Sequence, residues 1–219
     1  MESNSTLKNV MKKLYTAAVL ATAFAASVAS ATPIASTNTL NATLRVDNVY
    51  TIYLSTDDTK AGTSFGTLND YNATKPWSTS LVEGKDYYLH IFAQDTNGIA
   101  GMLGQFSLTG TNFQFVNGTQ SLLTNTKDWK ASKTGFGKDY ITPSAASASD
   151  ISSYWGKTSG ISGDAQWIWA GHNWDVNQAY FSTKISAIKA PTDVPEPGSL
   201  ALLGLGLAGV AVAARRRRG

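Results

Sequence analysis

The chain has 219 residues, a formal net charge of +3, six tryptophans and no cysteine. Seven of its 18 basic residues lie before residue 32 or after residue 194. The stretch between them holds eleven basic and thirteen acidic residues, and its net charge of −2 argues against a nucleic-acid-binding face. The absence of cysteine excludes disulfides, thiol nucleophiles and cysteine-ligated zinc, so stability must come from packing.

Residues 1–31 have the pattern of a secretory signal peptide. Lys12 and Lys13 form a basic start, and an apolar run follows from residue 14 to residue 26. Small residues then offer two cleavage sites, after Ala31 as the first choice and after Ala29 as the second. This segment is expected to be an N-terminal signal helix that is removed, whether translation starts at Met1 or at Met11.

Residues 32–189 are long enough for one domain with a sizeable core. Apolar alternation predicts strands within residues 41–55, 87–95, 101–108, 112–118, 165–171 and 179–188. Residues 87–95 are apolar on both parities, as expected for a strand covered on both faces or for one at the centre of a sandwich. Asn-Gly pairs at 97–98 and 117–118 mark tight turns. The Ser/Ala-rich residues 142–157 form a loop or a short helix. The pattern predicts an all-β domain, an antiparallel β-sandwich or jelly roll.

A resemblance to known modules extends over most of residues 40–188. The order DNVYTIYLS, LVEGKDYYLHIFAQDTNGIAGMLGQFSL and AQWIWA is similar to that of galactose-binding-domain-like jelly rolls. Such modules stand beside many extracellular glycan-active enzymes. The resemblance implies a fold and transfers no ligand residue.

The stretch WIWAGHNWD supplies the candidate glycan contacts Trp169, His172, Trp174 and Asp175. Sugars present apolar C–H faces that stack on aromatic rings. The alternative is that Trp167 and Trp169, two apart on a strand, share a face and fill the core. The other tryptophans, at 77, 129 and 155, either stack on a ligand or brace loops.

The sequence gives only weak indications of a catalytic site or a metal-binding site. His90 lies in the middle of a strand and is expected to be structural, whereas His172 with Asp175 could form an acid–base or metal pair. Aspartates at strand ends could hold a structural calcium ion or simply form turns; they are Asp47, Asp57, Asp58 and Asp95. There is no zinc-protease motif, nucleophile elbow or phosphate loop, so we expect no catalytic residue and no cofactor apart from that calcium ion. A glycosidase carboxylate pair would be set by the fold and leaves no sequence pattern.

The C-terminal residues form three segments. Residues 190–198 are a linker that contains Pro195, Glu196 and Pro197, which favour extended backbone. Residues 199–214 carry no charge and would form a helix about 24 Å long, a minimal transmembrane span for a hydrocarbon core of about 30 Å. Residues 215–219 are a basic tail that is expected on the cytoplasmic side. A buried core helix is the alternative, and the four adjacent arginines argue against it.

The order VPEPG, short apolar helix and arginine cluster resembles the PEP-CTERM proteins, the substrates of bacterial exosortases. The resemblance covers about the last 26 residues. It implies a Gram-negative, biofilm- or exopolysaccharide-producing source, in which Pro195, Glu196 and Pro197 are the sorting motif. By the same resemblance, the arginines hold the tail in the inner membrane until an exosortase-type transpeptidase processes the protein; they are Arg215, Arg216, Arg217 and Arg218.

These features predict an exported protein that faces the periplasm from the inner membrane and is then moved to the cell surface or released. Its expected role in the envelope or extracellular matrix is structural or adhesive, with weak binding to exopolysaccharide. One alternative is a secreted carbohydrate-active hydrolase that uses His172, Asp175 and a further acid. Another is a matrix protein without a glycan ligand.

Overall fold

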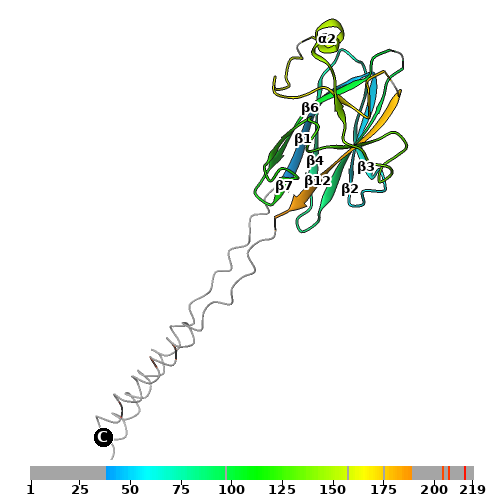
Figure 1. The fold of residues 1–219 in the computed structure, drawn as a ribbon. Helices are drawn as coiled ribbons and strands as arrows, with labels where there is room; N and C mark the ends of the chain where they lie inside the picture. Colours follow the sequence, from blue (N-terminus) through cyan, green and yellow to red (C-terminus); the bar gives the residue numbers. More distant parts are fainter. Residues whose placement is uncertain are drawn as a thin grey trace, which may run out of the picture. The chain divides into compact units, whose positions relative to one another are not determined.

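The computed structural model describes residues 38–188 except Asn97, Lys157 and Asp175, together with Gly204, Leu207 and Arg215 in the tail (Figure 1). The predicted signal helix, the sorting motif and the rest of the predicted transmembrane helix and basic tail lie outside these residues. Within the described part of the chain, no helix combines the length and the apolar character needed to span a membrane.

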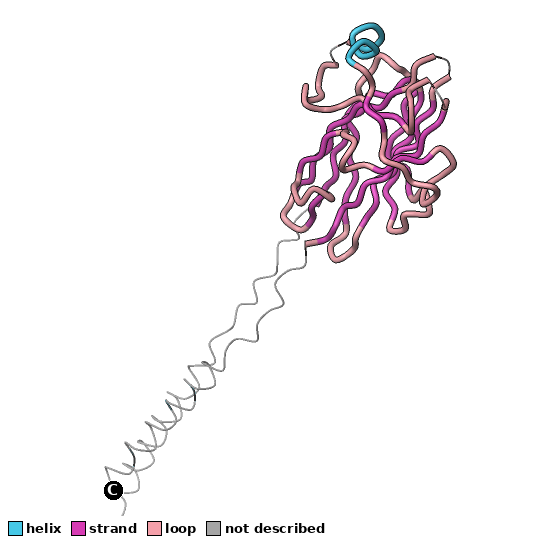
Figure 2. Tube along the Cα trace, viewed as in Figure 1, coloured by secondary structure: helices cyan, strands magenta, loops and turns pink. Residues whose placement is uncertain are grey.

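The domain consists of two antiparallel sheets (Figure 2). Sheet A has the order β10–β11–β6–β1–β4, and β8 also pairs with β6. Its strands are β1 (Asn38–Asp47), β4 (Lys75–Leu81), β6 (Gly101–Thr109), β8 (Ser121–Leu123), β10 (Ser144–Ala145) and β11 (Ile168–Trp169).

Sheet B has the order β3–β2–β5–β12–β7, and β9 also pairs with β12. Its strands are β2 (Val49–Ser55), β3 (Thr63–Asn69), β5 (Tyr87–Gln94), β7 (Phe113–Phe115), β9 (Lys130–Ser132) and β12 (Gln178–Ala187). The prediction of an all-β antiparallel sandwich is therefore confirmed, while the jelly-roll resemblance is supported only at the level of a two-sheet sandwich.

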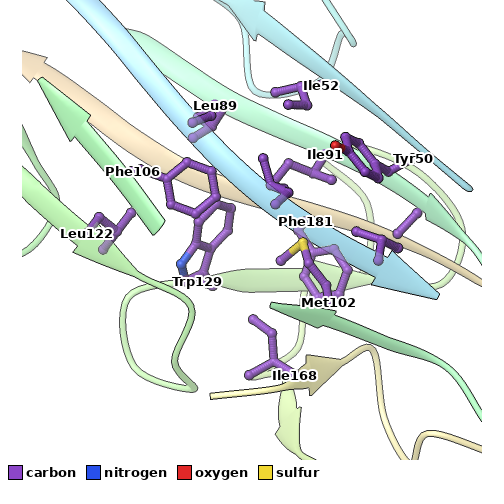
Figure 3. Packing of buried hydrophobic residues seen from close by; sticks show 14 of the residues in the cluster. Tyr50, Ile52, Leu89, Ile91, Met102, Phe106, Leu122, Trp129, Ile168 and Phe181 are labelled. Carbon is purple, nitrogen blue, oxygen red and sulfur yellow. The ribbon is translucent and has the colours of Figure 1, made fainter. Parts of the chain in front are cut away.

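One face of each sheet forms the core between them. In β1 every second residue, from Leu40 to Val46, is buried, and in β2 Tyr50 and Ile52 point the same way into the core. Figure 3 shows part of this cluster, which includes Ile91 of β5, Met102 of β6 and Phe181 of β12. Because side chains alternate along a strand, the apolar parity of these segments decides which face is inward.

Both sheets are also covered on their outer faces by parts of the long segment between β8 and β12. His90 of β5 is 0% exposed and lies under Phe136, with ring centroids 4.2 Å apart and an interplanar angle of 12°. On sheet A, Leu103 of β6 is buried in a second cluster with Trp155 and Trp167. The outer face of β5 is thus covered at His90, while Tyr88 and Phe92 on the same face stay partly exposed.

The edge strands β3 and β4 were not expected from the sequence. Most of their side chains are polar and half or fully exposed, so they give no apolar alternation. Trp77 of β4 braces them: its Nε1 donates to Tyr50 Oη at 3.0 Å, and its indole lies where a Cβ on Gly66 of β3 would stand.

The Ser/Ala-rich segment, for which a loop or a short helix was predicted, contains a short helix. α2 (Ala148–Asp150) begins after Ser147, whose Oγ accepts a hydrogen bond from the Asp150 amide. It runs into a single π-helical turn, η1 (Ile151–Trp155), which ends at Gly156. This unit stands at the end of the sandwich marked α2 in Figure 1.

Gly101 of β6 is expected to be indispensable for the outer cluster on sheet A. A Cβ there would lie 2.7 Å from Trp155 and 2.8 Å from Trp167, closer than packed atoms allow. We expect Gly101→Ala to lower the free energy of unfolding by about 1–3 kcal/mol, measured by urea denaturation. Gly163→Ala is the matched control, because nothing lies within 4 Å of its Cβ position. Equal stability of the two variants would contradict the packing described here.

Candidate functional site

Trp169 is not a glycan contact, and that prediction was wrong. Its side chain is 1% exposed, its ring lies edge-on to Phe181 at 5.8 Å, and its Nε1 donates to the Val176 carbonyl at 2.9 Å. The alternative, that Trp167 and Trp169 share a face and fill the core, is right about their burial and wrong about the shared face. They enter different clusters, since Trp169 lies in the core between the sheets and Trp167 stacks on Trp155.

Trp174 is half exposed and pairs with a residue that the sequence did not single out. Its indole meets Tyr154 of η1 edge to face, with ring centroids 5.8 Å apart and an interplanar angle of 76°. Trp174 is 50% exposed and Tyr154 is 53% exposed. The two rings, which we call the aromatic pair, therefore offer apolar surface to a ligand in solution.

The buried neighbour of Tyr154 fixes one half of the pair. Trp155 stacks on Trp167 with centroids 4.2 Å apart, and its Nε1 donates to Asp47 Oδ2 at 2.9 Å. Its carbonyl accepts from the Arg45 guanidinium at 3.0 Å. Because Trp155 is held on three sides, the adjacent Tyr154 is directed outward.

The loop that carries Trp174 is fixed in a similar way. The Ala100 amide donates to the Asn173 carbonyl at 2.8 Å, and the Trp169 indole holds the Val176 carbonyl. Gly171 begins the loop with φ +98°, a conformation that favours glycine. The second ring thus also stands on backbone that is tied to the core.

Polar groups border the aromatic pair. Asn173 Nδ2 donates to Asp150 Oδ2 at 3.1 Å, and this hydrogen bond, followed by those from Ser147 and by the charge of His172, lowers the pKa of Asp150. Asp150 is therefore ionised at neutral pH. His172 is exposed, and Asp175 lies outside the described residues, so the proposed pairing of these two stays a prediction.

His90 belongs to a polar network on the outer face of sheet B, below the loop that follows β9 and carries Phe136, which we call the covering loop. Its Nε2 lies 3.1 Å from Asp58 Oδ1, and the same oxygen accepts from Ser182 Oγ at 2.6 Å and from Tyr140 Oη at 2.8 Å. The Ser182 hydroxyl donates to the Asp58 carboxylate and makes no hydrogen bond to the His90 imidazole. These contacts fit the structural role expected for His90.

The four aspartates named as possible calcium ligands make different contacts. Burial, opposed by the hydrogen bond from Trp155, raises the pKa of Asp47, and the charge of the neighbouring Asp95 adds to this rise. Asp58 joins the network around His90, and Asp57 accepts from Thr59, whose side chain contributes most to a pKa of about 2 for Asp57. The structural calcium ion stays a prediction. Among the residues that the structure describes, no three His, Asp or Glu side chains gather to hold a metal ion.

A known family model covers a segment of the tail. Residues 193–218 match the PEP-CTERM protein-sorting motif. The PEP-CTERM motif indicates an exported protein that is anchored at the membrane before an exosortase, itself a membrane protein, processes it. No curated protein and no solved structure matches the chain. The motif thus identifies a sorting route, while the sandwich has to be interpreted from its own residues.

The polar network below the covering loop predicts an alkaline loss of stability. Burial, and then the hydrogen bond and charge of Asp58, raise the pKa of Tyr140 from the ordinary 10.0 to about 12. Between these values the unfolded chain loses the phenolic proton while the native protein keeps it, so stability present below pH 10 declines toward pH 12.

We expect Tyr140→Phe to be about 1–2 kcal/mol less stable at neutral pH, because Asp58 loses a donor. Between pH 10 and 12, the free energy of unfolding of this variant should decline less steeply than that of the wild type, measured by urea unfolding across that range. Tyr71→Phe, at an exposed tyrosine, is the control. A decline as steep in Tyr140→Phe as in the control would contradict this assignment.

Proposed function

We propose that this protein is a non-enzymatic component of the envelope or extracellular matrix that contacts exopolysaccharide through the aromatic pair Tyr154–Trp174. The observation that carries this proposal is the pair itself. Two half-exposed rings, one on η1 and one on the loop before β12, meet with centroids 5.8 Å apart. Aromatic rings stack well on the C–H faces of pyranoses and lose little side-chain entropy when they do so.

Polar groups beside the rings support the same ligand class. The carboxylate of Asp150 is oriented by a hydrogen bond at 3.1 Å from Asn173, whose own side chain is buried below it. Ser149, Ser152 and Ser153 add hydroxyl-bearing side chains on the same short helical unit. A sugar offers many hydroxyl groups, which can both donate to the carboxylate and accept from neighbouring donors.

The sorting route gives this contact its setting. In the proposed order of events, the leader is removed, the C-terminal segment anchors the protein in the inner membrane facing the periplasm, and an exosortase acts near Pro195–Pro197. The protein then reaches the cell surface or the medium. The PEP-CTERM match supports the exosortase step, and the remainder of this order follows from the predicted leader and tail.

Processing is tested on both termini of the protein from its native producer. We expect intact mass and peptide mapping to place the N-terminus near Thr32 and the C-terminus near Pro195–Pro197. Glu196→Ala, in the matched motif, should leave the chain intact through Gly219. Thr192→Ala, just outside that match, is the control and should be processed normally. A wild-type chain that keeps Gly219 in every fraction would refute exosortase processing.

Glycan contact is tested by electrophoresis in gels that contain the producer's purified exopolysaccharide. We expect wild-type protein to be retarded, and Trp174→Ala and Tyr154→Ala each to bind about fivefold more weakly because a stacking surface is lost. Trp174→Phe should keep most of the affinity, since a ring remains. Val116→Ala, at an exposed side chain on the β7–β8 turn, is the control.

Two outcomes of this assay would overturn the proposal. If wild-type protein migrates at the same rate with and without the polysaccharide, the sandwich has no such ligand. If the polymer becomes shorter during incubation, the protein is a hydrolase, and the non-enzymatic assignment fails.

A further inference from the structure

The outer face of sheet B carries a second aromatic feature, a cleft of about 380 Å³. Its floor consists of Tyr53 of β2, Phe92 of β5 and Tyr180 of β12, all partly exposed. Its walls are the loop before β3, with Thr59, and the loop after β9, with Phe136 and Lys138. We call this the aromatic cleft, and its volume lies in the range of about 300–1,000 Å³ that is usual for small-ligand sites.

The rings of the cleft form one connected surface. Phe92 and Tyr180 have centroids 5.1 Å apart on paired strand positions. Phe136 stands edge-on to Tyr180 at 5.2 Å and edge-on to Tyr53 at 6.0 Å. The result is an apolar floor with a perpendicular aromatic wall, a shape that can receive the flat face of a ring.

The polar network described above holds the walls in place. Phe136 stacks on His90, and Asp58 joins His90, Ser182 and Tyr140 through one carboxylate oxygen. Gly137 lies against Thr59 so closely that a Cβ would stand 2.7 Å from Thr59 Cα, which closes one loop against the other. A cleft fixed in this way needs little ordering when a ligand enters.

The polar groups at the cleft indicate the ligand's chemistry. Among the described residues, the hydroxyls of Tyr53 and Tyr180 make no hydrogen bond, and Lys138 makes no ion pair. The nearby Lys60 is neutralised by Asp57 at 3.0 Å, and Asp139 accepts from Thr134. The cleft thus offers an apolar floor, two phenols and one ammonium. The ammonium opposes a cationic ligand, which aromatic rings alone would attract.

We propose that the aromatic cleft binds a uronic acid unit of an acidic polysaccharide. The apolar face of the pyranose would lie on Phe92 and Tyr180, its hydroxyls would meet the two phenols, and its carboxylate would approach Lys138. This site is formed by strands β2, β5 and β12 and shares no residue with the aromatic pair, so it does not depend on the function proposed for that pair.

The test uses the full-length chain in a mild detergent and two matched probes, oligogalacturonate and oligogalactose, which differ in the carboxylate. We expect calorimetry to show tighter binding of oligogalacturonate. Lys138→Gln should weaken that binding about fivefold, the size of one exposed ion pair, and should leave oligogalactose binding unchanged. Because Lys138 is exposed, this variant should keep the wild-type unfolding temperature.

Two substitutions at Tyr180, on the floor of the cleft, distinguish the contribution of its ring from that of its hydroxyl. Tyr180→Ala should weaken binding of both probes about fivefold through lost stacking, whereas Tyr180→Phe should lose only the hydroxyl's share. Val116→Ala, at an exposed side chain that does not line the cleft, is the control.

Several results would overturn the cleft assignment. Equal affinity for the two probes, or equal affinity of wild type and Lys138→Gln for oligogalacturonate, would exclude recognition of the carboxylate. Loss of binding in Trp174→Ala with none in the cleft variants would place the sugar at the aromatic pair, so the cleft would fail and the proposed function would stand. A wild-type dimer that Tyr53→Ala makes monomeric would show that a second copy fills the cleft.

Discussion

The stacking of Trp155 on Trp167 above Gly101 holds the helical unit on sheet A and fixes the end of the domain. The two indoles are 4.2 Å apart, and the space under them exists because residue 101 has no side chain. Arg45 adds a second attachment: it binds the Trp155 carbonyl and lies over Trp167 at 5.6 Å. Stacking and cation–π contact are both strengthened by removal from water. The outward position of Tyr154 depends on this arrangement.

Sheet B uses a polar anchor where sheet A uses an aromatic one. Burial acts to raise the pKa of Asp58, but hydrogen bonds from Ser182, His90 and Tyr140 outweigh it and hold that pKa below its ordinary value. A carboxylate so satisfied can stay ionised in a half-buried position. The cost of removing it from water is offset only while all three donors remain, so the covering loop is tied to one geometry.

The chain carries its sorting motif in a short linear segment and its candidate contact surfaces on a folded domain. The sorting motif at residues 193–218 was recognised from sequence because a processing enzyme reads a short segment of defined order. A contact surface on the sandwich depends instead on residues that are far apart in the sequence. The aromatic pair joins residues 20 positions apart, and the aromatic cleft joins three strands and two loops. Such a surface arises only when the sheets have formed.

The sequence alone determined the sorting motif and the sandwich class, because the first depends on local order and the second on the alternation of side chains along β1 and β2. It also favoured a structural His90. It could not decide which tryptophans are exposed, since Trp169 and Trp174 stand in one short stretch and differ only in the partners that the fold supplies. The sequence did not indicate that Tyr154 or the cleft residues are exposed. An aromatic residue on the outer face of a strand or helix gives the same sequence pattern whether another segment covers it or not. Tertiary structure decided this by placing the segment between β8 and β12 over some rings and leaving others in solvent.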